Sequence, residues 1–202
     1  MRCPKDKQVQ LVASQLSQGL SVCHCSTCEG NWIPCVEYEQ WQAQQLIALQ
    51  ESVELPVTEP AFLDESLNFA PAATDAKAGL CPECGSYLAR TKISLKQPFY
   101  LERCPVCSGI WCDKGEWEVL EKLELTTKIP QLFSSPWQAQ MREKVQLEQE
   151  RQAVIEKLGI ELAQRTFDLA DALEKHENGS FAIAYVIRRF DKNSDKDAKG
   201  NA

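Results

Sequence analysis

The pattern of hydrophobic and polar positions divides the chain into short extended stretches, each followed by a helix. Residues 87–95 and 99–103 are rich in aromatic and β-favouring side chains and are broken near Gln97-Pro98, so they predict a β-hairpin. Beyond the hairpin, hydrophobic side chains at helical spacing predict a helix whose apolar face holds Trp117, Leu120 and Leu123.

A second helix of this kind is predicted earlier in the chain. It begins at Pro34, a residue type that suits the first turn of a helix, and it runs to about Glu51. Its helically spaced residues are Tyr38, Trp41, Gln45 and Leu49. The later helix starts differently, because Asp113 can cap it and Glu116 three residues on completes a pattern resembling a capping box.

The C-terminal third has the pattern of helices alone. A long polar helix is predicted to start at Ser135-Pro136, and Ser180 is predicted to cap a last short helix that ends at Arg188-Arg189. Between them lies a mostly apolar stripe, which indicates a core or helix-pairing face: Ile155, Leu158, Leu162, Thr166, Leu169 and Leu173. Two antiparallel helices are the simplest arrangement.

Prolines and polar runs mark the joints between these parts. Residues 52–79 contain three prolines among Ala, Thr and acidic residues, which predicts an extended linker that lets the flanking parts move relative to each other. Four hydrophobic residues in it are candidates for a strap that docks on one part: Phe62, Leu63, Leu67 and Phe69. The predicted organisation is 1–51, linker 52–79, 80–128, helical region 129–190 and disordered tail 191–202.

Four of the ten cysteines form two CxxC pairs on either side of the predicted hairpin: Cys81, Cys84, Cys104 and Cys107. Four thiolates are the ligand set of a structural zinc ion, and each short turn presents two sulfurs. A segment of about forty residues buries too little apolar surface to fold unaided, and zinc supplies the difference. The pattern therefore predicts a zinc ribbon. Two redox-active pairs are the alternative, but the βαβ setting of a thioredoxin-like motif is missing.

The chain also resembles itself. With a constant offset of 79, six residues of the first part match six of the second: Cys25, Cys28, Gly30, Trp32, Glu37 and Glu39 fall on Cys104, Cys107, Gly109, Trp111, Glu116 and Glu118. Cys3-Pro4 matches Cys81-Pro82, and Asp6 stands where the second copy has Cys84. We expect Gly30 and Gly109 to turn the chain with a positive φ and each tryptophan to cover its hairpin.

The first copy predicts a second metal site with a less common ligand set: Cys3, Asp6, Cys25 and Cys28. His24 and Cys35 are rival fourth ligands. The alternative is that this copy holds no metal and is stabilised by Trp32, Trp41 and their neighbours. With both sites filled, the chain would bind two zinc ions.

Charge narrows the possible partners. The net charge is −7, residues 80–125 carry six basic against seven acidic residues, and residues 126–202 balance at twelve each. A double-stranded DNA binder usually has a basic face, so nucleic acid is a possible partner only through a local patch at Arg90, Lys92 and Lys96. A protein partner fits the charge better.

Catalysis and membrane insertion are not expected. A Cys₄ site is closed to substrate, and His24 and His176 are the only histidines. The longest apolar run, residues 181–187, is too short to cross a bilayer. No secretory signal precedes Cys3, so we expect a reducing, cytoplasmic location. The remaining cysteines are buried small residues or, alternatively, redox-sensing thiols: Cys23, Cys35 and Cys112.

Residues 81–123 resemble the transcription factor IIB-type zinc-finger family of small bacterial proteins, because they contain CPxC, a following leucine and then ERCPxCxGxWxDxGE. Residues 3–41 resemble this family more loosely. The resemblance implies a zinc ribbon with Cys81, Cys84, Cys104 and Cys107 as ligands. Family members with CPxD in the first knuckle strengthen Asp6 as a ligand. Pro34-Cys35-Val36 replaces the DxGE turn in the first copy.

Together these features predict zinc-ribbon β-hairpin domains plus α-helices, an α+β fold with a helical C-terminal region. The function that follows is a cytoplasmic, non-enzymatic, zinc-binding module for interaction or assembly with a protein partner. A nucleic-acid-binding transcriptional regulator and a thiol redox sensor are the alternatives.

Overall fold

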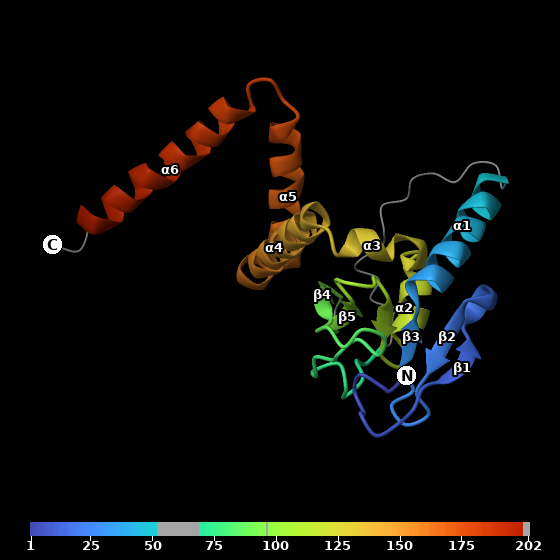
Figure 1. Cartoon of the computed structure of the whole chain (residues 1–202). Helices are drawn as coiled ribbons and strands as arrows, with labels where there is room; N and C mark the ends of the chain where they lie inside the picture. The colour runs from blue at the N-terminus through green and yellow to red at the C-terminus, as the bar shows by residue number, and fades with distance from the viewer. Residues whose placement is uncertain (52–68, 96, 200–202) are drawn as a thin grey trace. The chain divides into compact units, whose positions relative to one another are not determined.

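Six antiparallel strands form one sheet in the computed structural model, which describes residues 1–51, 69–95 and 97–199 (Figure 1). The strand order is β1-β2-β3-β6-β5-β4. The first three strands come from residues 1–51, here the first cysteine segment: β1 Val12–Gln15, β2 Ser21–His24 and β3 Asn31–Ile33. The other three come from residues 80–128, the second cysteine segment: β4 Ala89–Ile93, β5 Phe99–Arg103 and β6 Ile110–Cys112.

The two segments meet where β3 pairs with β6. The register places Trp32 opposite Trp111, and neither side chain is exposed. A Cβ atom on Gly30 would lie 2.2 Å from Cζ2 of Trp111, and a Cβ on Gly109 would lie 2.2 Å from Cζ2 of Trp32. Each glycine therefore makes room for the tryptophan of the other segment.

This arrangement corrects the expected role of the two glycines. The left-handed conformation falls on the preceding residues, Glu29 with φ 57° and Ser108 with φ 62°, and not on Gly30 or Gly109. The glycines are needed for space and not for backbone freedom. Each tryptophan covers the partner segment's glycine, which the pattern within one copy does not reveal.

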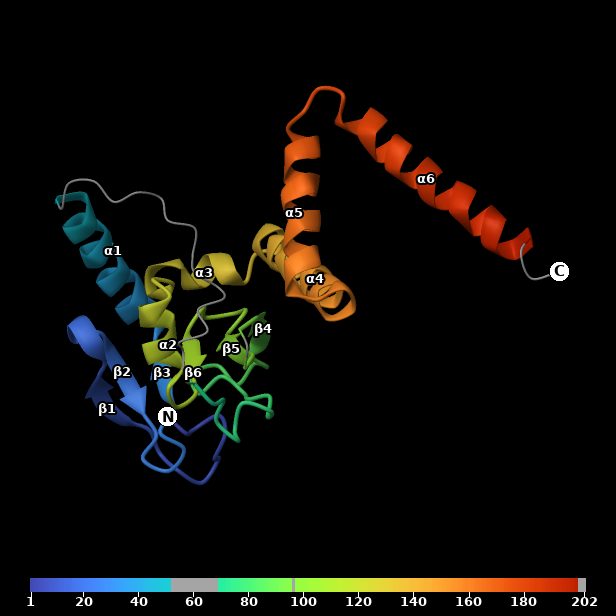
Figure 2. The ribbon, with the colours of Figure 1, turned by 180° about the vertical axis from the view of Figure 1, so that it is seen from behind.

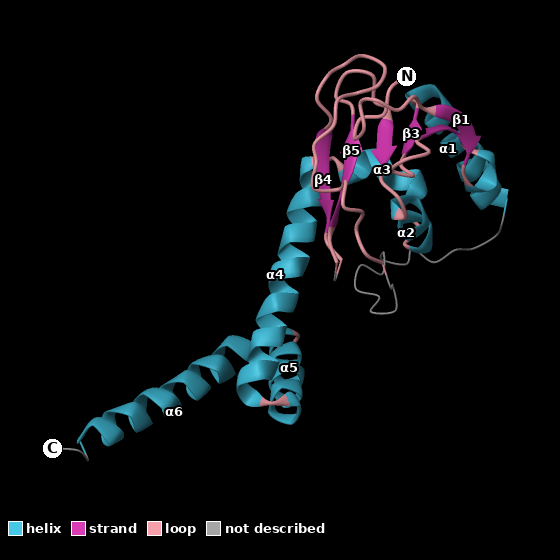
Figure 3. Ribbon diagram, turned by 90° about the horizontal axis from the view of Figure 1, so that it is seen from below, coloured by secondary structure: helices cyan, strands magenta, loops and turns pink. Residues whose placement is uncertain are grey.

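Helices cover one face of the sheet (Figure 3). They are α1 Cys35–Glu51, α2 Glu116–Lys122 and α3 Ile129–Leu132. Their buried side chains form one hydrophobic core with the strands: Tyr38, Trp41, Trp117, Leu120, Ile129 and Leu132 pack with Val22, Ile33, Phe99, Leu101 and Ile110. A second cluster surrounds the cysteines and contains Cys3, Cys25, Trp32, Cys81, Leu88, Cys104 and Trp111. The predicted α+β fold with a helical C-terminal region is confirmed.

The predicted helix starts are partly right. The α1 helix follows Pro34 directly and ends at Glu51 as predicted. At α2, Oε2 of Glu116 accepts a hydrogen bond from the backbone N–H of Asp113 at 2.8 Å, which is one half of a capping box. The other half is missing, because Gly115 with φ 81° is the N-cap and no side chain caps the helix.

The described end of the predicted linker is packed on the sheet. Phe69 meets Phe99 edge to face at 5.3 Å between ring centroids, and Asp75 accepts a hydrogen bond from the backbone N–H of Tyr100 at 2.9 Å. Phe69, one of the four strap candidates, thus packs on the second cysteine segment, whereas Phe62, Leu63 and Leu67 lie outside the described residues. The two segments were expected to move independently, but their strands share one sheet. The three-residue pairing strands are too short to show an alternating pattern.

Contact between residues divides the chain into two compact units, 1–142 and 143–202. The first unit extends past the predicted boundary at residue 128, because Ile129, Leu132 and Met141 join its core. The remaining helices are α4 Ser135–Leu158, which continues from the first unit into the second, α5 Ile160–Glu174 and α6 Gly179–Lys199 (Figure 2). No helix in the described part of the chain is long and apolar enough to cross a membrane.

The second unit differs from the simple two-helix arrangement. Gly159, with φ 75°, interrupts the predicted apolar stripe and ends α4 there. The last helix is also longer than predicted, since α6 runs through Lys199 into the segment for which the composition predicted disorder. It starts at Gly179, one residue before the predicted cap.

We predict that Gly30→Ala destabilises the first unit by about 1–3 kcal/mol, because its methyl group would overlap the Trp111 indole. Chemical denaturation followed by tryptophan fluorescence measures this loss. The same change in a Trp111→Phe background is the control, since the smaller ring leaves room for the methyl. An equal loss in both backgrounds would show that the two residues are not coupled.

Candidate metal centres

Four sulfur atoms of the second cysteine segment come together as predicted. One sulfur each from Cys81, Cys84, Cys104 and Cys107 lies within 4.8 Å of all the others. Cys81 is 3.4 Å from Cys107, and Cys84 is 3.4 Å from Cys104, measured between sulfur atoms. The two knuckles therefore face each other across the hairpin. This arrangement can hold a metal ion.

Backbone N–H groups of each knuckle point at its first sulfur. The amides of Glu83 and Cys84 donate to Sγ of Cys81 at 3.4 Å, and those of Val106 and Cys107 donate to Sγ of Cys104 at 3.4 Å. Such donors stabilise a thiolate, which is the metal-binding form of cysteine. The short CxxC turns supply both the sulfurs and the amides that hold their charge.

The surroundings shift the pKa values of Cys81, Cys84 and Cys107 in different directions. Hydrogen bonds from the side chain and backbone of Ser86 and contact with Cys104 lower the pKa of the Cys84 thiol to about 6. Burial raises the pKa of Cys81 and of Cys107, and for Cys107 the other cysteines add to that effect. A cation placed among the sulfurs would favour the thiolate form of all four.

The first cysteine segment brings three cysteines together. The sulfurs of Cys3, Cys25 and Cys28 lie within 4.8 Å of one another, and those of Cys3 and Cys28 are 3.5 Å apart. The knuckle repeats the hydrogen bonds of the other segment, since the amides of Lys5 and Asp6 donate to Sγ of Cys3 at 3.4 and 3.3 Å. This cluster can hold a metal ion if a fourth ligand completes it.

The predicted fourth ligand, Asp6, occupies the backbone position of Cys84 but is not part of the cluster. Its Oδ1 atom accepts a hydrogen bond from the backbone N–H of Gln8 at 3.1 Å. The rivals are also engaged elsewhere. His24 Nδ1 lies 3.0 Å from Oδ1 of Asn31, and the thiol of Cys35 donates to Oε1 of Glu39 at 3.2 Å. Neither rival joins the three sulfurs.

The thiols outside the clusters are poor candidates for reactive cysteines. Burial raises the pKa of Cys112, which is fully enclosed, and it also raises the pKa of Cys23. Burial, with the hydrogen bond to the Glu39 carboxylate, raises the pKa of Cys35. A redox-sensing thiol needs the opposite shift, because the thiolate is the reactive form. For Cys112, burial as a small apolar residue matches the expectation.

Sequence reasoning missed a buried ion network that joins the two segments. Lys5 lies between Cys3 and Asp6 in the first knuckle, yet its Nζ atom is 3.0 Å from Oε1 of Glu102 and 3.3 Å from Oδ2 of Asp113. All three of these side chains are fully buried. An ammonium group without these two carboxylates would be costly to bury, so the pairing fixes the first knuckle against the second segment.

The indole N–H groups of Trp32 and Trp111 add two hydrogen bonds near this ion network. Nε1 of Trp32 donates to Oε1 of Glu83 at 3.0 Å, and Nε1 of Trp111 donates to Oδ1 of Asp113 at 3.0 Å. Lys5 and Glu83 are the residues two after Cys3 and Cys81. The same knuckle position in each segment therefore reaches a partner on the other side of the β3–β6 joint. The signal in the sequence was a charged residue at this position in both copies.

Buried carboxylates outnumber buried cations in this network. Oxygens of Asp75, Asp113 and Glu116 lie within 4.8 Å of one another. The Glu116 side chain is fully buried, and its Oε1 atom has no hydrogen-bond partner among the described residues. Burial and the neighbouring Asp113 raise the pKa of Glu116 well above its ordinary value. The folded protein therefore favours the neutral form of this side chain.

One residue of the predicted phosphate-binding face, Arg90, is engaged within the protein. Nε of Arg90 is 3.1 Å from Oε1 of Glu102, and the guanidinium lies over the Tyr100 ring at 4.2 Å. Lys92 is exposed, and Lys96 lies outside the described residues. Arg90 thus belongs to the internal ion network, where carboxylates balance its charge.

Searches against known protein families, curated proteins and solved structures find no match for this chain. The likeness to a zinc-finger family therefore depends on the motif residues alone.

We predict that Lys5→Met lowers the free energy of unfolding by about 3–5 kcal/mol, because it leaves Glu102 and Asp113 without their shared cation in a buried place. Thermal and chemical denaturation check the loss. The matched control is Lys7→Met, since Lys7 is exposed two residues away. Equal effects of the two changes would contradict the role assigned to the buried ion pairs.

Proposed function

We propose that this protein is a zinc-binding, non-enzymatic module for interaction or assembly, built from two zinc ribbons on one sheet. The cluster of Cys81, Cys84, Cys104 and Cys107 is the observation that carries the proposal. Four sulfurs with backbone N–H donors around them are a soft ligand set of the number that zinc prefers, which suits zinc and disfavours hard cations. Such a site binds a structural ion.

The first ribbon is proposed to hold a second zinc ion through Cys3, Cys25 and Cys28, with Asp6 as the fourth ligand. Asp6 follows Cys3 by three residues, as Cys84 follows Cys81, so its carboxylate starts from the ligand position of the knuckle. It would exchange its hydrogen bond to Gln8 for the metal. An oxygen donor in place of sulfur predicts a weaker site than the second one.

A structural role for the metal supports the non-enzymatic function. Four cysteine ligands leave no open position for a substrate or an activated water molecule. The two histidines of the chain are outside the clusters, as His24 bonds with Asn31 and the ring of His176 accepts the backbone N–H of Asn178. Neither is positioned beside the sulfurs as a general base.

Among the alternative functions, assembly with a protein is best supported. The ion pairs of Arg90 weaken a nucleic-acid-binding regulator, and the raised pKa values of Cys23, Cys35 and Cys112 weaken a redox sensor. We place the function in the cytoplasm, where cysteines stay reduced and available to a metal. The zinc ions would stabilise the sheet, and the module would bind its partner through its surface.

Metal analysis tests the proposal. We predict two zinc ions per purified chain, one after Cys84→Ser and one after Asp6→Ala. Cys35→Ser is the matched control and should leave two, because that thiol is outside both clusters. Removal of metal by a chelator should unfold the sheet, since structural zinc contributes on the order of 10 kcal/mol or more to folding.

The counts separate the parts of the proposal. One ion in the unchanged chain would mean that the first ribbon binds no metal. An unchanged count after Asp6→Ala would remove Asp6 as a ligand. Iron in place of zinc, or no metal, would contradict the assignment of the ion itself.

A further inference from the structure

The second unit exposes most of its apolar side chains. Among its residues with described side chains, Ala163 is the buried hydrophobic residue. On α6 the exposed fractions are 49% for Ile183, 40% for Val186 and 54% for Ile187. Helices with apolar side chains around most of their surface are normally covered by other structure. The second unit therefore has apolar surface that the described part of the chain does not cover.

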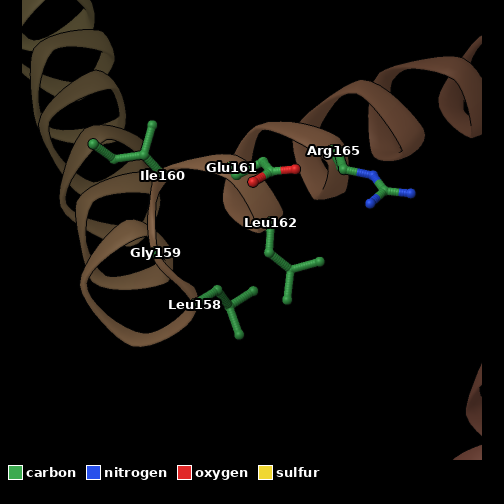
Figure 4. Close-up of a pocket in the computed structure, with 6 residues that line it drawn as sticks. All are labelled: Leu158, Gly159, Ile160, Glu161, Leu162 and Arg165. Carbon is green, nitrogen blue, oxygen red and sulfur yellow. The ribbon is translucent and has the colours of Figure 1, made fainter.

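Only one face of α5 is packed. Phe167 is half-buried on that face and lies under the guanidinium of Arg151 on α4, 4.0 Å from it. The other face holds an exposed leucine stripe, here defined as Leu158, at the end of α4, with Leu162 and Leu169 on α5. Figure 4 shows Leu158 and Leu162 side by side at a hollow that Ile160, Glu161 and Arg165 also line.

The turn after α5 keeps α6 of the same chain away from this stripe. A Cβ atom on Gly179 would lie 1.8 Å from the carbonyl oxygen of Leu173, so the two helices touch tightly at their junction. Hydrogen bonds fix the turn, since the N–H of His176 donates to the carbonyl of Leu173 at 3.2 Å and that of Gly179 to the carbonyl of His176 at 2.9 Å. The exposed apolar side chains beyond this turn show that α6 does not fold back along α5.

The charges of the two helices are complementary. The α5 helix carries Glu161, Asp168, Asp171 and Glu174 against Arg165, which gives a net charge of −3. Residues 179–190 of α6 carry Arg188 and Arg189 and no acidic residue, which gives +2. Glu161 and Asp168 are seven residues apart and so lie on one side of the helix, each directly before a leucine of the stripe. The apolar, positively charged part of α6 therefore complements the leucine stripe and the acidic residues beside it.

We propose that the chain forms a two-fold dimer in which α6 of each copy lies along the leucine stripe of α5 of the other. Two equivalent contacts close the assembly, as a symmetric dimer requires. The complementary charges and the turn that separates α5 from α6 identify a second copy as the occupant. The dimer goes beyond the proposed metal-dependent function, because no part of this contact includes a metal ligand.

Two charge-reversal variants test the dimer by light scattering after size-exclusion chromatography. The unchanged protein should have twice the 22.8 kDa mass of one chain. Variant one, Arg188→Glu with Arg189→Glu, places acid against acid, and variant two, Glu161→Arg with Asp168→Arg, places base against base. Each alone should dimerise about 10- to 100-fold more weakly. An equimolar mixture should restore the dimer, because both contacts of the mixed pair then join opposite charges.

A third variant tests the apolar contact. Leu169→Glu, at an exposed position, should give a monomer, whereas Val36→Glu, at an exposed position of α1, should leave the dimer intact. Helical circular dichroism and the metal count of each variant show that the fold is retained, which also separates this result from the zinc proposal. A monomeric unchanged chain at tens of micromolar would overturn the dimer. So would variants that dimerise as tightly as the unchanged chain, or a mixture that stays monomeric.

Discussion

Antiparallel pairing of β3 with β6 joins the two cysteine segments, and the absence of a side chain at Gly30 and Gly109 makes this pairing possible. Each glycine admits the indole of the other segment's tryptophan to a position that a methyl group would fill. The fully buried Trp32 and Trp111 then form the middle of one sheet and not the covers of two separate hairpins. The packing of α1, α2 and α3 on one continuous face depends on that union.

The same joint connects the candidate metal centres. Lys5 in the first knuckle binds carboxylates of the second segment, and Glu83 in the second knuckle accepts from Trp32 of the first. Lys5 and Glu83 each lie between two candidate ligand positions of a knuckle, so the position of each candidate centre is linked to the joint. Buried ion pairs of this kind add little stability beyond a hydrophobic core, but they oppose any arrangement that leaves one charge alone. The network therefore favours this one pairing of the two segments.

The sequence predicted those elements that depend on residues close together in the chain. The hairpin strand Phe99–Arg103, the helix Cys35–Glu51 and the sulfur cluster of the second segment follow from side-chain preference, a proline at a helix start and CxxC spacing. The union of the segments could not be predicted in this way, since it depends on side chains far apart in sequence. Lys5 and Glu102, for example, are brought together only by β3 and β6. The place of Asp6 was predicted by analogy with Cys84, but its carboxylate bonds locally with Gln8.

Native-state hydrogen exchange of the backbone amides in the metal-loaded protein tests most directly whether the two segments form one folding unit. If β3 and β6 hold a single sheet together, amides of β2 and β5 should open with the same free energy, equal to that of global unfolding. Added denaturant should lower the free energy of opening by the same amount in β2 and in β5. Protection that is much lower in β2 than in β5, with a different dependence on denaturant, would contradict the shared sheet and show two separately folding segments.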